Sequence, residues 1–183
     1  MFIYLEYEWL GISLTVLPYL LLFLLGVSEL SDAFDGYFAR KYNQVTDFGK
    51  ILDPMADSIY RVSVFLTFTR PPVSLPLLLV FVFLYRDSVI STLRTICAFR
   101  GFALAARSTG KIKAIIQAGS ALFILIMMIP YSLSMLSKSI LREASIIVTA
   151  LAAAYALYSG IDYIFANRDY VARLLTKEKQ EGE

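Results

Sequence analysis

The sequence predicts an all-α protein, a polytopic membrane bundle of about five to six transmembrane helices. The 183-residue chain is 58% hydrophobic and only 17% charged, and its mean hydropathy is +0.65. A typical soluble domain carries about 25% charged residues. Uncharged stretches at 9–28, 71–85, 114–137 and 144–161 reach or approach the roughly 20 residues that a helix needs to cross a bilayer core.

The expected spans follow one another along a single domain. They lie near residues 9–37, 48–69, 73–97, 110–131 and 143–166, and each includes polar residues next to its apolar stretch. The first has no preceding basic region and no small-residue cleavage site, so we expect it to be retained rather than removed as a signal peptide. Residues 1–175 are thus predicted to form one transmembrane domain, and 176–183 a charged cytoplasmic tail.

Basic residues predict the orientation, because short cytoplasmic loops are enriched in Lys and Arg. The first and third connections and the tail hold most of them: Arg40, Lys41, Lys50, Arg86, Arg94, Arg100, Arg107, Lys111, Lys113, Arg168, Arg173, Lys177 and Lys179. The opposite side would hold only Arg70, Lys138 and Arg142. We therefore expect the N-terminus outside and the tail in the cytoplasm. The basic residues follow this topology without a nucleic-acid motif, so a nucleic-acid partner is not expected.

The chain contains no histidine, and Cys97 is its only cysteine. An internal disulfide, histidine acid/base chemistry and histidine-ligated zinc are therefore excluded. Any metal must be held by oxygen, and aspartate-rich sites favour hard cations such as Mg²⁺ or Mn²⁺.

Four aspartates flank the first connection, on its cytoplasmic side. Asp32 and Asp35 are spaced i, i+3, and Asp53 and Asp57 are spaced i, i+4, so each pair lies on one helix face. Carboxylates beside hydrocarbon are costly and indicate function by default. Because the connection at 41–48 is short, the two faces could converge on a pair of divalent cations.

Residues between the aspartates suit a phosphate-bearing substrate. Gly36 and Ala39 leave room for a flat ligand group beside the backbone, and Arg40 offers a planar fork to phosphate oxygens. If an alcohol attacks, a carboxylate must take its proton. We assign that role to Asp57, with Arg61 one turn away to orient it or to bind an anion.

Structural alternatives exist for the individual aspartates. Asp53 precedes Pro54, an ordinary N-cap arrangement. Asp32 with Arg40, or Asp57 with Arg61, could form an ion pair near the membrane interface. These alternatives do not readily account for all four aspartates and both glycines in this spacing.

The motif resembles that of the CDP-alcohol phosphatidyltransferases. Asp32-Ala-Phe-Asp35-Gly36-Tyr-Phe-Ala39-Arg40, Gly49, Asp53 and Asp57 match D-x2-D-G-x2-A-R-x8-G-x3-D-x3-D at every fixed position. The resemblance implies a six-helix membrane fold, usually a homodimer, that transfers a phosphatidyl group from CDP-diacylglycerol to an alcohol and releases CMP. It implies that the four aspartates bind two metal ions and that Asp57 is also the base. The residues implied in binding CDP-diacylglycerol are Gly36, Ala39, Arg40, Thr46 and Gly49.

A finer resemblance points to the phosphatidylglycerophosphate synthase subgroup, whose acceptor is glycerol 3-phosphate. It is carried by 52–57, Arg86-Asp87, Leu93-Arg94, 110–113 and Gln117. The residues implied in binding the acceptor phosphate are Arg86, Arg94, Lys111 and Lys113. Alternatively, Lys111 and Lys113 only anchor the cytoplasmic side of a helix. The distribution of basic residues predicts that the active site faces the cytoplasm, and we expect the protein to lie in a bacterial inner membrane.

Two features depart from the family pattern. The 31 residues before Asp32 leave room for one span, whereas the family usually has an additional helix there, and Ser58 stands where many relatives carry lysine. Asp162 and Tyr163, near the cytoplasmic end of the last predicted span, are weaker candidates for lining the active-site cavity. Other acceptors, namely inositol phosphate, serine or phosphatidylglycerol, remain alternatives. A divalent-cation transporter is a less favoured one, because transporter sites lie near the midplane between repeated halves and no repeat is visible.

Overall fold

The chain folds into a bundle of long helices. The structure, a computed structural model, describes residues 2–41, 47–99 and 107–170; within these ranges the side chains of 2, 29, 32–33, 35–40 and 47–54 are not described. The helices in the described part are α1 (Phe2–Leu5), α2 (Leu17–Lys41), α3 (Asp47–Thr67), α4 (Leu77–Phe99), α5 (Ser108–Ser132) and α6 (Lys138–Ala166). The described part holds no strand, so the all-α prediction is confirmed.

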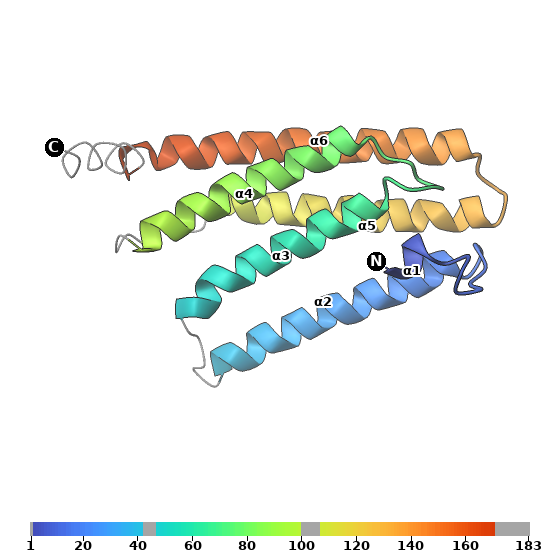
Figure 1. Cartoon of the computed structure of the whole chain (residues 1–183), viewed down its shortest axis with the longest axis horizontal. Coiled ribbons are helices and arrows are strands. Elements are labelled where there is room, and N and C mark those ends of the chain that lie inside the picture. Colours follow the sequence, from blue (N-terminus) through green and yellow to red (C-terminus); the bar gives the residue numbers. More distant parts are fainter. Residues whose placement is uncertain (1, 42–46, 100–106, 171–183) are drawn as a thin grey trace.

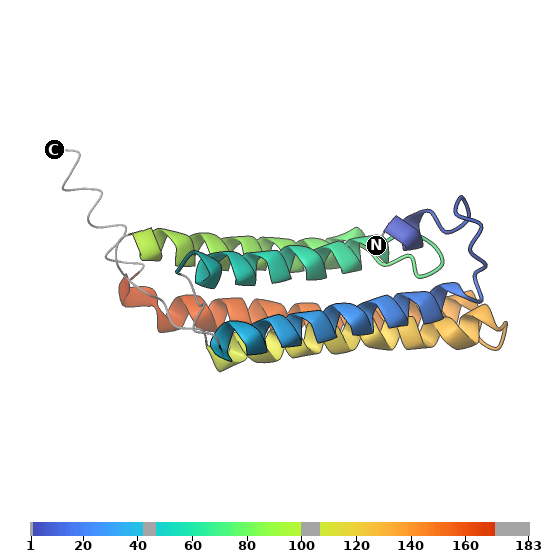
Figure 2. The same cartoon turned by 90° about the horizontal axis from the view of Figure 1, so that it is seen from below.

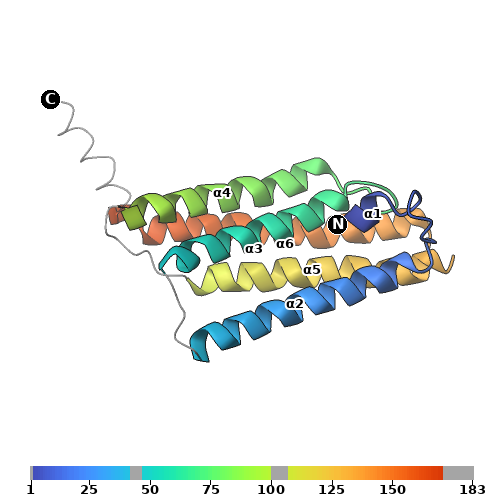
Figure 3. The ribbon, with the colours of Figure 1, turned by 60° about the horizontal axis from the view of Figure 1, so that its bottom comes forward.

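The long helices α2 to α6 run side by side, with α2, α3 and α4 inclined to α5 and α6 (Figure 1). Seen from below, α3 and α4 form one layer, and α2, α5 and α6 form the other (Figure 2). Helix α5 packs against α2, α3 and α6, and α4 packs against α3 and α6; Figure 3 shows α5 between α2 and α6. Successive helices alternate in direction, so the C-terminal halves of α2, α4 and α6 meet the N-terminal halves of α3 and α5. We call this the charged end of the bundle.

The first long helix begins later than the sequence predicts. Residues 6–16 form turns, and Gly11 adopts a φ of +68°, a conformation that glycine reaches without strain. The hydroxyl of Ser13 then accepts a hydrogen bond of 3.3 Å from the backbone N–H of Val16, and Pro18 lies in the first turn of α2, where proline is tolerated. The predicted start at residue 9 is therefore wrong; α2 begins at Leu17 and extends to Lys41.

The N-cap interpretation of Asp53 is also wrong. Helix α3 begins at Asp47, so Asp53 and Pro54 lie inside it rather than at its start. A cap is needed only where backbone N–H groups lack a carbonyl partner in the preceding turn. With a full turn of α3 ahead of it, Asp53 is not needed for that purpose.

Apolar packing holds the opposite end of the bundle together. Tyr4 of α1 is 2% exposed, contacts the Phe68 ring edge-on at 5.7 Å, and donates a hydrogen bond of 3.1 Å to the carbonyl oxygen of Arg70. The ring centres of Phe65 on α3 and Phe83 on α4 lie 4.9 Å apart. Such aromatic pairs contribute about 0.5–1.5 kcal/mol beyond the area that they bury.

Two of the described helices, α5 and α6, are long and apolar enough to cross a membrane, while the apolar part of α2, Leu17–Ser28, is shorter. Among the described residues, five long helices lie close to the five predicted spans. The other three, α2, α3 and α4, carry charged residues in the part of the helix nearer the charged end, and these residues lower the mean hydropathy of each helix. The predicted number of long helices is therefore confirmed for the described residues. Only α5 and α6 also have the apolar composition expected of a membrane span.

Candidate functional site

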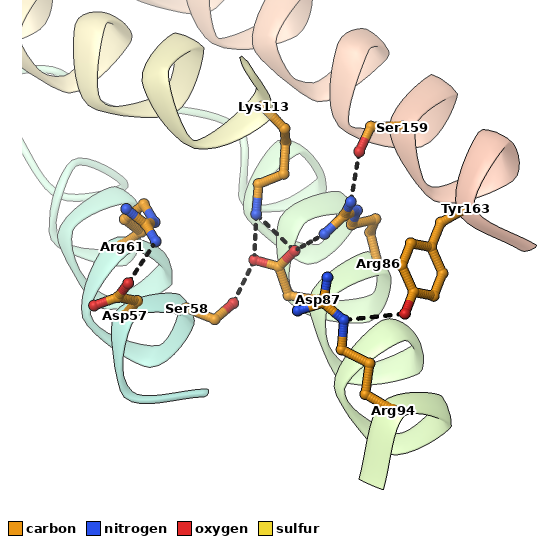
Figure 4. Close-up of polar contacts among 9 residues, drawn as sticks. All are labelled: Asp57, Ser58, Arg61, Arg86, Asp87, Arg94, Lys113, Ser159 and Tyr163. Carbon is orange, nitrogen blue, oxygen red and sulfur yellow. Dashed lines mark hydrogen bonds and ion pairs between the residues drawn. The ribbon is translucent and has the colours of Figure 1, made fainter. Parts of the chain in front are cut away.

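Asp87, in the middle of α4, lies at the centre of a buried polar cluster that borders the charged end (Figure 4). Its two carboxylate oxygens each accept a hydrogen bond of 2.7 Å from the ammonium group of Lys113 on α5. Arg86 Nη1 lies 3.0 Å from Asp87 Oδ1, and the hydroxyl of Ser58 on α3 donates to Asp87 Oδ2. The side chains of Asp87 and Lys113 are only 7% and 6% exposed. Together with Ser159, these residues are called the Asp87 cluster below.

Arg86 extends this cluster to α6. Its Nη2 donates a hydrogen bond to the hydroxyl of Ser159, next to Gly160. A Cβ atom at Gly160 would lie 3.1 Å from Arg86 Cγ, closer than ordinary van der Waals contact, so the absence of a side chain makes room for the arginine stem. Within the described part, Arg86 Nε is buried without a hydrogen-bond partner.

Arg94 lies two helical turns beyond Arg86 on α4 and contacts a different residue of α6. Its Nε donates a hydrogen bond of 3.1 Å to the hydroxyl of Tyr163, and its guanidinium carbon lies 5.1 Å from the centre of that ring. This is cation–π geometry, which stabilises a cation without neutralising it.

Asp57 and Arg61 form an ion pair on α3. Asp57 Oδ2 lies 3.3 Å from Arg61 Nη2, and the side chains are 55% and 25% exposed. The ion-pair alternative for these two residues is thus seen in the structure, and it is compatible with a second role because the carboxylate stays accessible. Ser58, the next residue, points to Asp87 instead (Figure 4).

The remaining motif residues lie at the charged end by their backbone positions. Asp32, Asp35, Gly36, Ala39 and Arg40 belong to the C-terminal half of α2, and Gly49 and Asp53 to the N-terminal half of α3. Their side chains and Thr46 lie outside the described residues, so the convergence of four carboxylates stays a prediction. Among the described side chains, no three or more from His, Cys, Asp and Glu form a group that could hold a metal ion.

The four basic residues predicted to bind the acceptor are only partly brought together. Arg86 and Lys113 meet at Asp87, Arg94 lies beside Tyr163, and Lys111 is exposed on α5. Anchoring at the headgroup level suits an exposed lysine, so that alternative fits Lys111 better than Lys113.

Asp162 lies outside the Asp87 cluster. Its Oδ2 is 3.0 Å from Arg107 Nε and accepts a hydrogen bond of 2.8 Å from the hydroxyl of Thr109. These contacts join α6 to the start of α5. Tyr163, in contrast, contacts Arg94 and is 2% exposed.

The sequence interpretation assigned no role to Asp87, Ser58 or Ser159. A carboxylate within a predicted span is itself an indication of function, so Asp87 could have been found. Serine is common in membrane helices and contacts neighbouring helices in many ways. Ser58 is distinguished in the sequence only as a departure from the family pattern, and nothing distinguishes Ser159 from the other serines.

A cavity of about 180 Å³ lies between α2 and α3, away from the Asp87 cluster. Its lining is mostly apolar and includes Leu21, Leu25 and Ser28 of α2, Tyr60, Ser63 and Val64 of α3, and Leu125 of α5. None of the predicted site residues is among those that line it.

Comparison with known proteins places the chain in a family. A model of the CDP-alcohol phosphatidyltransferase family matches residues 7–159. The CDP-diacylglycerol–glycerol-3-phosphate 3-phosphatidyltransferase of Bacillus subtilis is 34% identical over 107 residues, which are 58% of this chain and 55% of that protein. A probable phosphatidylglycerophosphate synthase of Mycobacterium tuberculosis is 30% identical over 136 residues, 74% of this chain and 59% of that protein.

A third relative carries a different name. The cardiolipin synthase (CMP-forming) of Streptomyces coelicolor is 36% identical over 81 residues, 44% of this chain and 37% of that protein. The chain spans about half the length of the curated relatives that it matches first. The family match includes both acidic helices and every residue of the Asp87 cluster, and the chain belongs to the CDP-alcohol phosphatidyltransferase family, which is embedded in membranes.

Proposed function

We propose that this chain transfers the phosphatidyl group from CDP-diacylglycerol to glycerol 3-phosphate, giving phosphatidylglycerophosphate and CMP in phospholipid biosynthesis. The observation that carries the acceptor assignment is the charge of the Asp87 cluster, in which Arg86 and Lys113 face a single carboxylate. A buried excess of positive charge is costly unless an anion balances it. An acceptor that bears a phosphate supplies such an anion.

Asp32, Asp35, Asp53 and Asp57 are proposed to hold two divalent cations, Mg²⁺ or Mn²⁺. The donor set is chemically suited to them, because it consists of carboxylate oxygens alone, and the described member, Asp57, is 55% exposed and so accessible. When bound, the cations neutralise the pyrophosphate of the donor and the charge on the departing CMP. Gly36, Ala39, Arg40, Thr46 and Gly49 are proposed to bind the nucleotide portion of CDP-diacylglycerol.

Asp57 is proposed to act as the general base. Its carboxylate takes the proton from the primary hydroxyl of glycerol 3-phosphate, and that oxygen attacks the phosphorus that bears diacylglycerol. A new P–O bond forms as the bond to the CMP phosphate breaks. Arg61, 3.3 Å from Asp57 Oδ2, holds the carboxylate in place, since a fixed orientation favours proton transfer.

Arg86 and Lys113, with Arg94, are proposed to bind the acceptor phosphate, while the exposed Lys111 is proposed to anchor the cytoplasmic side of α5. Ser58 ties Asp87 to α3 at the residue that follows Asp57, so the acceptor cations and the proposed base are connected through one short path. The phosphate and the reacting hydroxyl of glycerol 3-phosphate are separated by a three-carbon chain, which suits two subsites close to each other.

The proposed setting is the bacterial cytoplasmic membrane, with the site open to the cytoplasm and the protein a homodimer. The enrichment of basic residues near the charged end supports this orientation. The relatives named above are bacterial.

An assay of acceptors tests the reaction. The chain, reconstituted in lipid, is given CDP-diacylglycerol labelled in the cytidine and each candidate acceptor in turn: glycerol 3-phosphate, phosphatidylglycerol, serine and inositol phosphate. We expect CMP release with glycerol 3-phosphate. Release with phosphatidylglycerol alone would instead favour the chemistry named for the Streptomyces relative, and cation uptake into sealed vesicles without CMP release would favour a transporter.

A further inference from the structure

Asp87 connects three helices through one carboxylate. It contacts Lys113 of α5 and Ser58 of α3 from its own position on α4. Arg86, on the same helix, contacts both Asp87 and Ser159 of α6. A carboxylate that is 7% exposed and accepts hydrogen bonds from three side chains has a tightly fixed position.

The composition of the Asp87 cluster differs from that of a simple structural ion pair. One cation is enough to balance a buried carboxylate, yet Arg86 Nη1 and Lys113 Nζ lie 3.0 Å and 2.7 Å from the same oxygen, Oδ1. Two cations so close together repel each other at low dielectric. Asp87 is therefore what allows them to lie side by side before any anion binds.

We propose that Asp87 is a positioning residue: it holds Arg86 and Lys113 together as a preformed pair for the acceptor phosphate and, through Ser58, ties that pair to the helix that carries Asp57. This inference rests on the proposed function. Asp87 does not touch the reacting atoms; it acts through the two cations. Since both cations point at one carboxylate, a phosphate arriving beside them meets donors that are already oriented, which lowers the entropy lost on binding.

The inference makes an unusual prediction about the sign of the effect. If Asp87 were only a nearby negative charge, its neutralisation would make the site more positive and phosphate binding tighter. If it positions the cations, its neutralisation lets them separate and binding becomes weaker. The direction of the change therefore distinguishes the two roles.

The test measures binding of glycerol 3-phosphate by calorimetry and, in parallel, the KM for each substrate, using the full chain in lipid nanodiscs. The variants are Asp87→Asn, Asp87→Glu and Ser58→Ala. Ser145→Ala is the matched control, because Ser145 is also a buried helix serine but donates only to the carbonyl oxygen of Leu141 in its own helix. Unfolding followed by circular dichroism reports on the fold of each variant.

We expect Asp87→Asn to weaken glycerol 3-phosphate binding about tenfold or more, with the KM for CDP-diacylglycerol within about twofold of the wild type. Asp87→Glu should recover part of the loss, and Ser58→Ala should weaken acceptor binding about threefold while Ser145→Ala leaves it unchanged. Tighter or unchanged acceptor binding in Asp87→Asn would overturn the inference. So would an equal loss for both substrates.

The same experiment separates this inference from the proposed function. A wild-type chain that binds glycerol 3-phosphate but releases no CMP would overturn the reaction, and the binding ratio between Asp87→Asn and the wild type would still decide the role of Asp87. A wild-type chain that does not bind glycerol 3-phosphate would overturn both. If Asp87→Asn fails to fold, the comparison of Ser58→Ala with Ser145→Ala decides.

Discussion

The ammonium group of Lys113 lies 2.7 Å from both carboxylate oxygens of Asp87, and the two side chains are 6% and 7% exposed. The pair joins the first turns of α5 to the middle of α4. Within a helix bundle, such a contact makes each partner dependent on the other, because either one alone would be a buried charge.

Replacing Lys113 by methionine should therefore lower the stability of the bundle. Loss of the sole partner of a buried charge costs about 3–5 kcal/mol, and we expect about 2–3 kcal/mol here because Arg86 stays close to Asp87. The free energy of unfolding in detergent, measured with a chemical denaturant, checks this. Lys111→Met on the same helix is the control, since Lys111 is exposed; an equal loss in both variants would contradict the prediction.

Gly160→Ala should impair use of the acceptor. Its Cβ would lie 3.1 Å from Arg86 Cγ, so the arginine, held by Asp87 at one side and Ser159 at the other, must shift. We expect kcat/KM for glycerol 3-phosphate to fall about three- to tenfold.

Gly119→Ala is the control for Gly160→Ala, because a Cβ at Gly119 meets no atom within 4 Å. The control should keep its activity and gain about 0.5–1 kcal/mol in stability, as alanine favours the helix. Equal kinetic effects in the two variants would show that the space around Arg86 does not matter.

Asp57→Asn should abolish turnover and spare donor binding. An amide cannot take the proton of the acceptor hydroxyl, and loss of a general base lowers rates by about 10²–10⁴-fold. CMP release measures the turnover, and equilibrium binding of labelled CDP-diacylglycerol measures the donor affinity. Loss of donor affinity as large as that for Asp32→Asn would indicate that Asp57 serves only as a metal ligand.

Removal of divalent cations should stop the reaction reversibly. A chelator is expected to abolish CMP release, and Mg²⁺ or Mn²⁺ should restore it, because the predicted ligands are carboxylates alone. Titration of each cation into the chelated protein gives the affinity. Full activity after exhaustive chelation would rule out the two-metal proposal.

Much of the bundle could be predicted from local sequence. The uncharged stretches predict five long helices close to α2 through α6, because an apolar run of that length has few other stable forms in a membrane. The ends of the helices are harder to predict from the sequence. The apolar run that begins at Trp9 starts in turns, since Gly11 with positive φ and the hydrogen bond from Val16 to the Ser13 hydroxyl form a turn before the helix begins at Leu17.

The candidate site, too, could be predicted only in part from the sequence. Arg86, Asp87 and Lys113 could be named from a resemblance, yet the contacts of Asp87 with Lys113 and Ser58 could not, because contacts across helices depend on how each helix is rotated about its axis. Ser58 illustrates the point: its position opposite Asp87 becomes visible only when α3 and α4 are packed together.

The sequence by itself determined the helical class, the long helices and the motif that places two carboxylates on one face of each acidic helix, because these follow from spacing along a chain whose helical period is known. The tertiary structure decided which charges meet. Lys113 and Ser58 lie 26 and 29 residues from Asp87, and Ser159 lies 73 residues from Arg86. No local pattern sets such pairings; they follow from the depth and rotation at which whole helices pack.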